Sequence, residues 1–366
     1  DWSLVQWIEE VVPRLSDELS EHVTTETHRS VVELRTRPHH RVGDAVAELG
    51  GLRSRLQDEL EPMGACAAAV GTHPMTVWQE TEVSSGERHQ AVYGSMRELA
   101  RREPTFALHV HLGVPSPEEA MSLMNRMRAH LPALLALSAN SPYWQGRDTG
   151  LASARTPLFQ AFPRVGIPRV FEDYDDYVET VDLLIRTEAL AEHTLLWWDI
   201  RPQPPLGTVE VRIMDVQTTV ANTAALAALV QSVARLELEE GFASPTLVGA
   251  SSVLVENRFL AARDGIDARM IDPDGERRVP VREQVEDLLE ACLPHARALG
   301  CADELASVRR LLERSGAGRQ RALMRGHRAR LPALLAALAY AFSPEEYAAG
   351  HLERRFAEIR ERARTF

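Results

Sequence analysis

The chain has 366 residues, a formal charge of −12 and a hydrophobic content of 45%, which are ordinary values for a folded protein with a large core. This acidic balance argues against a nucleic-acid partner, whose phosphates need a basic surface. The sequence contains no lysine, so all 41 basic residues are arginine. Chemistry that requires a lysine amine from the protein, such as a Walker A loop or a pyridoxal Schiff base, is therefore excluded.

Cysteine usage and hydropathy indicate a cytoplasmic protein without a membrane partner. The three cysteines, Cys66, Cys292 and Cys301, are too sparse for a disulfide framework or a zinc quartet. No apolar run reaches the roughly 18–20 residues that cross a bilayer, and the N-terminal residues lack the pattern of a signal peptide. Cys66 lies in an alanine-rich run beside no local histidine, so we interpret it as a small buried residue rather than a nucleophile.

Three strands are predicted in the first third of the chain. Alternation over residues 31–36 places Glu33 on the polar face of a half-buried strand. After a helical pattern at 43–60, a second strand at 66–72 leads into a turn that contains His73. The third strand, at 106–114, carries apolar residues on one face and both His109 and His111 on the other.

The rest of the chain turns from strands to helices. A Ser-Pro-Glu-Glu start at 116–119 predicts a helix that Pro132 bends, and residues 138–173 form a long loop of the kind that carries function. A hairpin at 195–215 places Glu210 and Arg212 on one polar face. Helical patterns follow from 218, with a second Ser-Pro-Glu-Glu start at 343–346. We therefore predict an α+β fold, strand-rich over 22–216 and mostly helical over 217–366.

Acidic and imidazole side chains recur on the polar faces of these strands. The residues concerned are Glu26, Glu33, His109, His111 and Glu210. Because antiparallel strands of one sheet bring such faces together, we expect a site for Mg²⁺ or Mn²⁺, which prefer oxygen ligands and share them with phosphates. The alternatives are hydrogen-bonded histidines on a solvated sheet face and an exposed cross-strand pair of Glu210 with Arg212.

Three arginines near these strands, Arg155, Arg201 and Arg212, are forked donors suited to carboxylate or phosphate, although surface solubility explains most of the 41 arginines. Together with a metal site they suggest ATP-dependent activation of a carboxylic acid. The sequence lacks a G-x-S-x-G elbow. The glycine-rich segment at 316–322 lacks the third glycine of a dinucleotide loop and is interpreted as a phosphate- or substrate-facing loop.

Six segments, in order along the chain, resemble the bacterial glutamate-cysteine ligase-like carboxylate-amine ligases of the YbdK type, in the glutamine synthetase-like superfamily. The matching segments are ETHRSVVELRT at 26–36, GTHP at 71–74, HVHLG at 109–113, ALSANSPYWQGRDTGLASAR at 136–155, WWDIRPQPPLGTVEVRIMD at 197–215 and ENRFLAARDGIDA at 256–268. The long run around 141–155 makes this a specific match.

The resemblance implies one catalytic domain over residues 1–366, in which a curved antiparallel sheet flanked by helices binds ATP and Mg²⁺ or Mn²⁺. It implies that a glutamate-like carboxylate attacks the γ-phosphate, and that a cysteine-like amine converts the acyl phosphate to an amide. ADP and phosphate are released. A homodimer of this chain is also suggested.

The same resemblance implies roles for individual residues. The expected metal ligands are Glu26, Glu33, His109 and Glu210. The expected nucleotide contacts are His111 and Arg212, and the expected catalytic residues are Arg201 and Arg212. The expected substrate contacts are His73, Trp144, Gln145 and Arg155.

One feature of the family is not found in this sequence. Such proteins normally begin with a strand of the form G-[VI]-E-E-E-F, whose glutamates complete the metal site, and we expect this strand to be missing from the N-terminus. A non-catalytic relative that binds nucleotide or an amino acid at an incomplete metal site is therefore the alternative function. A metal-dependent hydrolase that works without ATP is a third.

Overall fold

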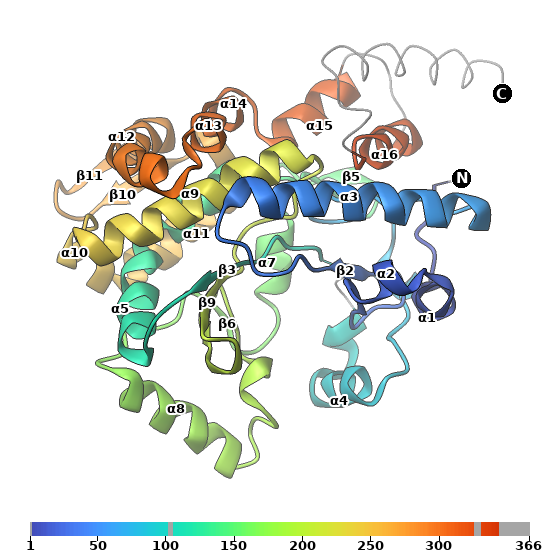
Figure 1. Ribbon diagram of the computed structural model, residues 1–366, viewed down its shortest axis with the longest axis horizontal. Helices are drawn as coiled ribbons and strands as arrows, with labels where there is room; N and C mark the ends of the chain where they lie inside the picture. Colours follow the sequence, from blue (N-terminus) through green and yellow to red (C-terminus); the bar gives the residue numbers. More distant parts are fainter. Residues whose placement is uncertain (1, 102–104, 326–330, 344–366) are drawn as a thin grey trace.

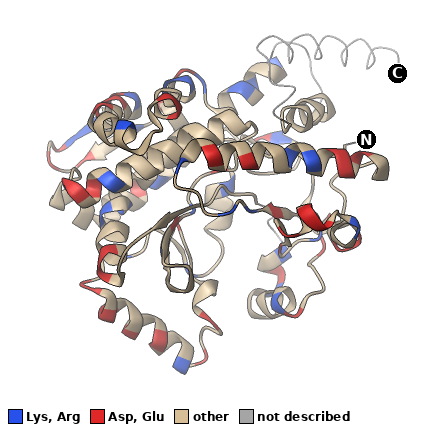
Figure 2. Ribbon diagram, viewed as in Figure 1, with Lys and Arg blue, Asp and Glu red and all other residues tan. Residues whose placement is uncertain are grey.

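The computed structural model describes residues 2–101, 105–325 and 331–343 and confirms the α+β class (Figure 1). Helices dominate, and the strands form small sheets that are antiparallel except for one parallel pair. None of the helices in the described ranges is long and apolar enough to cross a membrane. In the view of Figure 2, acidic positions gather along helix α8 (Tyr174–Arg186), which ends in a basic residue, and positions of both signs are scattered among the other helices.

The elements have the following bounds. The helices are α1 Ile8–Val11, α2 Asp17–Ser20, α3 Val42–Leu60, α4 Glu87–Met96, α5 Pro117–Met127, α6 Leu131–Ser138, α7 Arg155–Phe159, α8 Tyr174–Arg186, α9 Val220–Glu239, α10 Pro245–Gly249, α11 Ser251–Asp264, α12 Val281–Leu299, α13 Ala302–Ala306, α14 Val308–Glu313, α15 Gly316–Arg325 and α16 Leu331–Tyr340. The strands are β1 Val23–Thr25, β2 Val32–Leu34, β3 Val110–Gly113, β4 Tyr143–Trp144, β5 Arg147–Asp148, β6 Val165–Gly166, β7 Trp197–Trp198, β8 Ile200–Gln203, β9 Thr208–Val211, β10 Arg269–Asp272 and β11 Arg277–Pro280.

The largest sheet has three antiparallel strands in the order β3-β9-β8. Its register places His111 opposite Glu210, and Glu210 opposite Arg201, so these three residues share one face of the sheet. Strands β1 and β2 pair separately, with Glu33 opposite Thr24. The strands that we expected in one curved sheet are thus divided, in the described residues, into this sheet and two-stranded pairs; the curvature stays a prediction.

The prediction of a strand at 66–72 is wrong. Residues 65–70 form no regular secondary structure, and Thr72 makes a single bridge to Thr105. Cys66 is exposed rather than buried, while its neighbours Ala65 and Ala67 pack against a hydrophobic cluster, which corrects the interpretation of Cys66 as a core residue. Alternating small residues cannot distinguish a strand from an extended connection, since pairing depends on what lies beside the segment.

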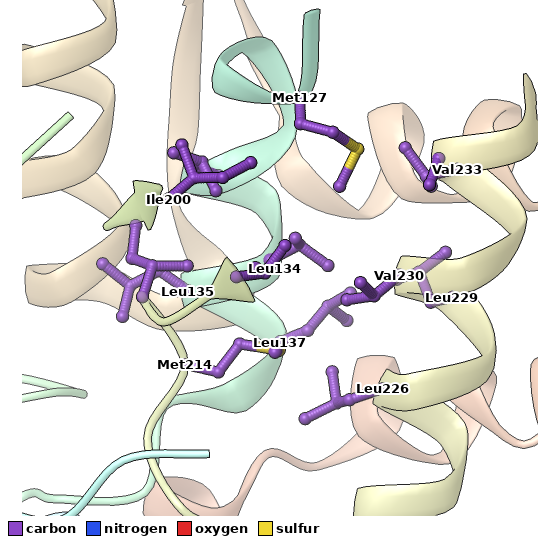
Figure 3. Packing of buried hydrophobic residues seen from close by; sticks show 14 of the residues in the cluster. Met127, Leu134, Leu135, Leu137, Ile200, Met214, Leu226, Leu229, Val230 and Val233 are labelled. Carbon is purple, nitrogen blue, oxygen red and sulfur yellow. The ribbon is translucent and has the colours of Figure 1, made fainter. Parts of the chain in front are cut away.

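The main core lies between the sheet and helices α5, α6 and α9 (Figure 3). Leu134 and Leu137 of α6 face Leu226 and Val230 of α9, and Ile200 of β8 packs on the opposite side of α6. The helix that Pro132 was predicted to bend is divided into two helices just before this proline. Helix α5 ends at Met127, a 3-10 turn follows, and α6 begins at Leu131 with the proline in its first turn, where its missing N–H is harmless.

The described part of the C-terminal third is mostly helical, as predicted, and its break at 272–279 lies in the β10–β11 hairpin. The loop interpretation of 316–322 is wrong, because Gly316 begins helix α15. Ser315 caps this turn by accepting a hydrogen bond from the Gly318 N–H. Of the second Ser-Pro-Glu-Glu start at 343–346, only Ser343 is among the described residues. The predicted helix after it lies outside them.

Close packing at the start of α15 can be tested by substitution. A Cβ atom at Gly316 would lie 2.2 Å from Oδ1 of Asn140, whose side chain is held by Gln320 and Val216. We expect Gly316→Ala to lower the free energy of unfolding by about 1–3 kcal/mol, measured by urea denaturation. The matched control is Gly51→Ala in α3, where no described atom lies within 4 Å of the added Cβ apart from the adjoining residues and backbone of its own helix; it should stabilise the protein by about 0.5–1 kcal/mol. Equal stability of the two variants would contradict this packing.

Candidate functional site

A buried carboxylate, Glu210 of β9, lies at the centre of the candidate site. It is 2% exposed and accepts three side-chain hydrogen bonds. Its Oε2 atom accepts from Nε of Arg201 at 2.7 Å and from Nε2 of Gln203 at 2.7 Å, and its Oε1 atom accepts from Nη1 of Arg212 at 2.8 Å. Because alternate residues of β8 and β9 point to the same side, Arg201, Gln203, Glu210 and Arg212 converge from two strands.

Charge explains why Glu210 stays ionised in this buried position. Burial by itself opposes ionisation, but the positive charges of Arg212 and Arg201 outweigh it and hold the pKa of Glu210 well below its ordinary value. Arg201 is fixed further by donating through Nη1 to the carbonyl oxygens of Thr194 at 2.6 Å and Leu196 at 2.7 Å. The result is a preorganised cluster of two cations around one anion.

His109 and His111 lie next to this cluster, as predicted. Nδ1 of His109 is 3.4 Å from Oε1 of Glu210, and Nε2 of His111 is 4.0 Å from the same oxygen. Burial and the charge of Arg212 lower the pKa of His109 well below its ordinary value, and burial also lowers the pKa of His111. Both imidazoles are therefore neutral near pH 7, and a neutral ring has a nitrogen that can ligate a metal or accept a hydrogen bond.

Glu33 and Glu26 reach the same region from the β1–β2 pair. Burial raises the pKa of Glu33, and the negative charges of Glu26 and Glu210 raise it further. The hydroxyl of Thr24 donates to Oε2 of Glu33 at 3.3 Å. The structure thus brings the predicted acidic and imidazole residues of β2, β3 and β9 close enough to influence each other's ionisation.

The donor atoms of these residues match a hard divalent cation in their chemistry. Acidic neighbours raise the pKa of Glu33, so a bound cation would stabilise its ionised form. The neutral imidazole of His109 offers a nitrogen ligand beside it. However, among the residues that the structure describes, no group of three or more His, Cys, Asp or Glu is arranged to hold a metal ion. The oxygens of Glu210 are also largely occupied by Arg201, Gln203 and Arg212.

Arg155, the first residue of α7, is buried and faces the main chain that follows β9. Nη1 donates to the carbonyl oxygen of Ile213 at 3.0 Å and Nη2 donates to that of Arg212 at 3.2 Å. Nη1 also lies 3.6 Å from the carboxylate of Asp215. A direct substrate contact by Arg155 stays a prediction; what the geometry gives is a link between α7 and the segment directly after β9, which carries Arg212.

The predicted substrate residues His73, Trp144 and Gln145 lie on two adjacent turns. The hydroxyl of Thr72 donates to the carbonyl oxygen of Tyr143 at 2.8 Å, and the Gly146 N–H donates to that of Pro74 at 2.8 Å. Gln145, with φ 48°, and Gly146, with φ 78°, form the two-residue turn of the β4–β5 hairpin. Gln145 is the unusual residue of this hairpin, because its backbone is left-handed and its buried Nε2 atom has no hydrogen-bond partner among the residues that the structure describes.

His73 has a structural task within its own turn. Its Nδ1 atom accepts hydrogen bonds from the N–H of Thr76 at 3.0 Å and that of Met75 at 3.3 Å. Burial lowers the pKa of His73 to about 4, so the ring is neutral near pH 7. Contact of His73 with a substrate stays a prediction.

Two polar residues of this region were missed from the sequence. Gln203 could have been found, because it lies two residues after Arg201 on the same face of β8 and so points to the same side. Asp215 follows the end of β9, where the alternation that placed Glu210 and Arg212 no longer holds. No local signal in the sequence distinguished it.

Comparison with known proteins gives a consistent result. The model of glutamate-cysteine ligase family 2 (GCS2) matches residues 4–357. A protein of Rubrobacter xylanophilus, provisionally named glutamate–cysteine ligase 2-1, is 42% identical over 319 residues, which cover 87% of this chain and 85% of the relative. A Sorangium cellulosum protein, provisionally named glutamate–cysteine ligase 2, is 40% identical over 304 residues, covering 81% of this chain and 80% of the relative.

A solved structure shares the fold. The crystal structure of a glutamate–cysteine ligase from Francisella tularensis in complex with AMP covers 93% of this chain and 85% of its own, with a TM-score of 0.64 and 13% sequence identity. The family model spans nearly the whole sequence, and two relatives exceed one third identity over most of their length. The chain belongs to glutamate-cysteine ligase family 2.

Proposed function

We propose that this protein is an ATP-dependent carboxylate–amine ligase, which joins a glutamate-like carboxylate to a cysteine-like amine through an acyl phosphate and releases ADP and phosphate. The observation that carries the proposal is the buried Glu210 with its two paired arginines, next to two neutral histidines and the Glu33 carboxylate. Metal, phosphate and carboxylate recognition all have suitable groups in one region. The names of the relatives and the AMP bound by the related ligase support the same reaction class.

The arginines are the groups proposed to act on the transferring phosphoryl group. Arg212 donates to Glu210 through Nη1, and none of the described residues accepts from its other guanidinium N–H groups. Glu210 offsets the repulsion between Arg201 and Arg212 and holds both in place before a ligand arrives. Such preorganised cations stabilise the charge that develops on phosphoryl oxygens, which is the main source of rate in this chemistry.

The metal and substrate roles follow the predicted assignment, except that Arg155 is proposed to hold the main chain and not a substrate. We propose that Glu26, Glu33, His109 and Glu210 hold Mg²⁺ or Mn²⁺, with His111 beside the phosphates. These side chains would have to rearrange on binding, because the described residues place no three such ligands around one ion. When bound, such an ion supplies charge neutralisation and orientation of the phosphate oxygens. His73, Trp144 and Gln145 would contact substrate from the two adjacent turns. A single catalytic domain, a homodimeric assembly and a cytoplasmic location belong to the same proposal.

A second function is favoured by one observation, the lack of a three-ligand metal group in the described residues. A relative of the ligases that binds nucleotide or an amino acid without turnover would fit an incomplete metal site. The two candidates can be told apart by one measurement, because the non-catalytic relative would bind nucleotide or an amino acid but form no amide.

The direct test is turnover. Incubation of the protein with ATP, Mg²⁺, L-glutamate and L-cysteine should release ADP and phosphate in step with a new amide, detected by mass spectrometry. Other acids and amines, tested singly, identify the preferred pair. ATP binding in calorimetry without product from any pair would favour the non-catalytic relative, and hydrolysis of a substrate with metal but no ATP would favour the metal-dependent hydrolase.

Glu210 provides the sharpest variant. Glu210→Gln keeps the shape but removes the charge that pairs Arg201 with Arg212, so we expect kcat to fall by about 10² or more. The matched control is Glu237→Gln, another buried carboxylate, which pairs with Arg126 and His130. It should destabilise the protein without a comparable loss of kcat per folded molecule. A Glu210→Gln variant as active as the control would remove Glu210 from the site.

A further inference from the structure

Asp215 is a buried carboxylate outside the predicted set of site residues. It is 0% exposed and accepts hydrogen bonds from one backbone N–H and two hydroxyls. The donors are Asn140 N at 2.8 Å, Oγ of Ser141 at 2.7 Å and Oγ of Ser153 at 2.9 Å. Both carboxylate oxygens are therefore held in fixed directions by the loop that precedes α7.

Asp215 also packs against the turn that carries His73. A Cβ atom at Gly71 would lie 2.8 Å from Oδ2 of Asp215 and 2.9 Å from Cβ of Ser141, so only glycine allows this approach. The glycine of the GTHP turn, the loop from 140 to 153 and the end of β9 thus meet at one carboxylate. These segments carry the predicted substrate residues on one side and Glu210 and Arg212 on the other.

Arg155, the ion-pair partner of Asp215, connects this carboxylate to the main chain of Arg212. Arg155 is 6% exposed, and its Nη1 and Nη2 atoms donate to the carbonyl oxygens of Ile213 and Arg212. Its Nε atom has no hydrogen-bond partner in the described residues. Asp215, 3.6 Å from Nη1, is the carboxylate that the structure pairs with this guanidinium. Arg155 therefore holds the main chain at Arg212 while Asp215 offsets its charge.

Energetics favour a positional role over a purely stabilising one. A buried ion pair contributes little net stability compared with apolar residues of the same volume, although removal of one partner alone is costly. What such a pair supplies is a defined geometry, and here that geometry is imposed on the peptide units at Arg212 and Ile213. The guanidinium of Arg212 extends from this fixed segment to Glu210.

We propose that Asp215 is a positioning residue, which acts through Arg155 to fix the backbone at Arg212 and so directs the Arg212 guanidinium toward the phosphates of a nucleotide. This role rests on the proposed function, because it concerns the arginine assigned to the phosphoryl group. Arg155 is a positioning residue as well, because it links Asp215 to the main chain at Arg212 and Ile213. No proton or bond is transferred at either residue.

The test compares Asp215→Asn with the Glu237→Gln control, which also loses a buried charge but belongs to a different cluster. Calorimetry with Mg·ATP gives Kd, and steady-state assays with L-glutamate and L-cysteine give kcat and KM. We expect Asp215→Asn to weaken Mg·ATP binding about tenfold and to lower kcat about 10²-fold, while KM for the amine changes less than about twofold. The control should leave the Kd for Mg·ATP and kcat near wild type.

Two further variants separate positioning from misfolding. Ser153→Ala removes one donor to Asp215 and should give a smaller loss in the same direction, in a protein with a near-normal unfolding transition. The double variant Asp215→Asn/Arg155→Met should lose no more kcat than either single variant, because residues that act as one unit are not additive. Additive losses would mean that Arg155 contacts substrate independently and would overturn the proposal.

The outcomes distinguish the positioning role from the ligase reaction. If the wild type binds Mg·ATP but forms no amide, the proposed reaction fails, and the Kd values still decide the role of Asp215. If Asp215→Asn binds Mg·ATP as tightly as the wild type does, the positioning role is overturned. A wild type that does not bind Mg·ATP overturns both.

Discussion

The structure around the candidate site depends on one buried negative charge. Glu210 is removed from water, and its ionised form is stable because Arg201, Arg212 and Gln203 donate to both of its oxygens. In return, the carboxylate allows two guanidinium groups to lie near each other in a partly dry environment. Neutral His109 follows from the same arrangement, since a nearby arginine and burial both disfavour its protonation. Charge balance in this cluster therefore sets the protonation state of its neighbours.

The absence of lysine gives arginine a large structural role in this chain. Arg128 is fully buried and donates to the carbonyl oxygens of Pro168 and Val248, and Arg53 donates to those of Gln217 and Thr218. Burial lowers the pKa of each of these two arginines to about 10. A planar group with five donors can join main-chain segments in this way, which an ammonium group does less well. An arginine in a motif of this protein is therefore not by itself a sign of a ligand.

Much of the strand-borne site could be predicted because β-strands have a period of two. Alternation alone placed His109 with His111, and Glu210 with Arg212, on polar faces, and the structure brings these faces together. Pro132 predicted a bend in this region, and the structure has a full separation of α5 from α6 there. The division of the strands into several small sheets, and the extended but unpaired segment at 65–70, could not be predicted, because pairing depends on neighbours distant in sequence.

Residue types, their alternation along strands and the ordered motifs were sufficient to establish the α+β class and the family, and they predicted the main polar residues of the candidate site. Tertiary structure alone decided which of those residues are joined by hydrogen bonds and which serve the main chain. Arg155, Arg201 and Arg212 have the same chemistry in the sequence, yet two of them pair with Glu210 and the third holds backbone carbonyl oxygens. The physical reason is that a guanidinium binds whatever acceptors the fold places around it, and those acceptors come from segments far apart in the chain.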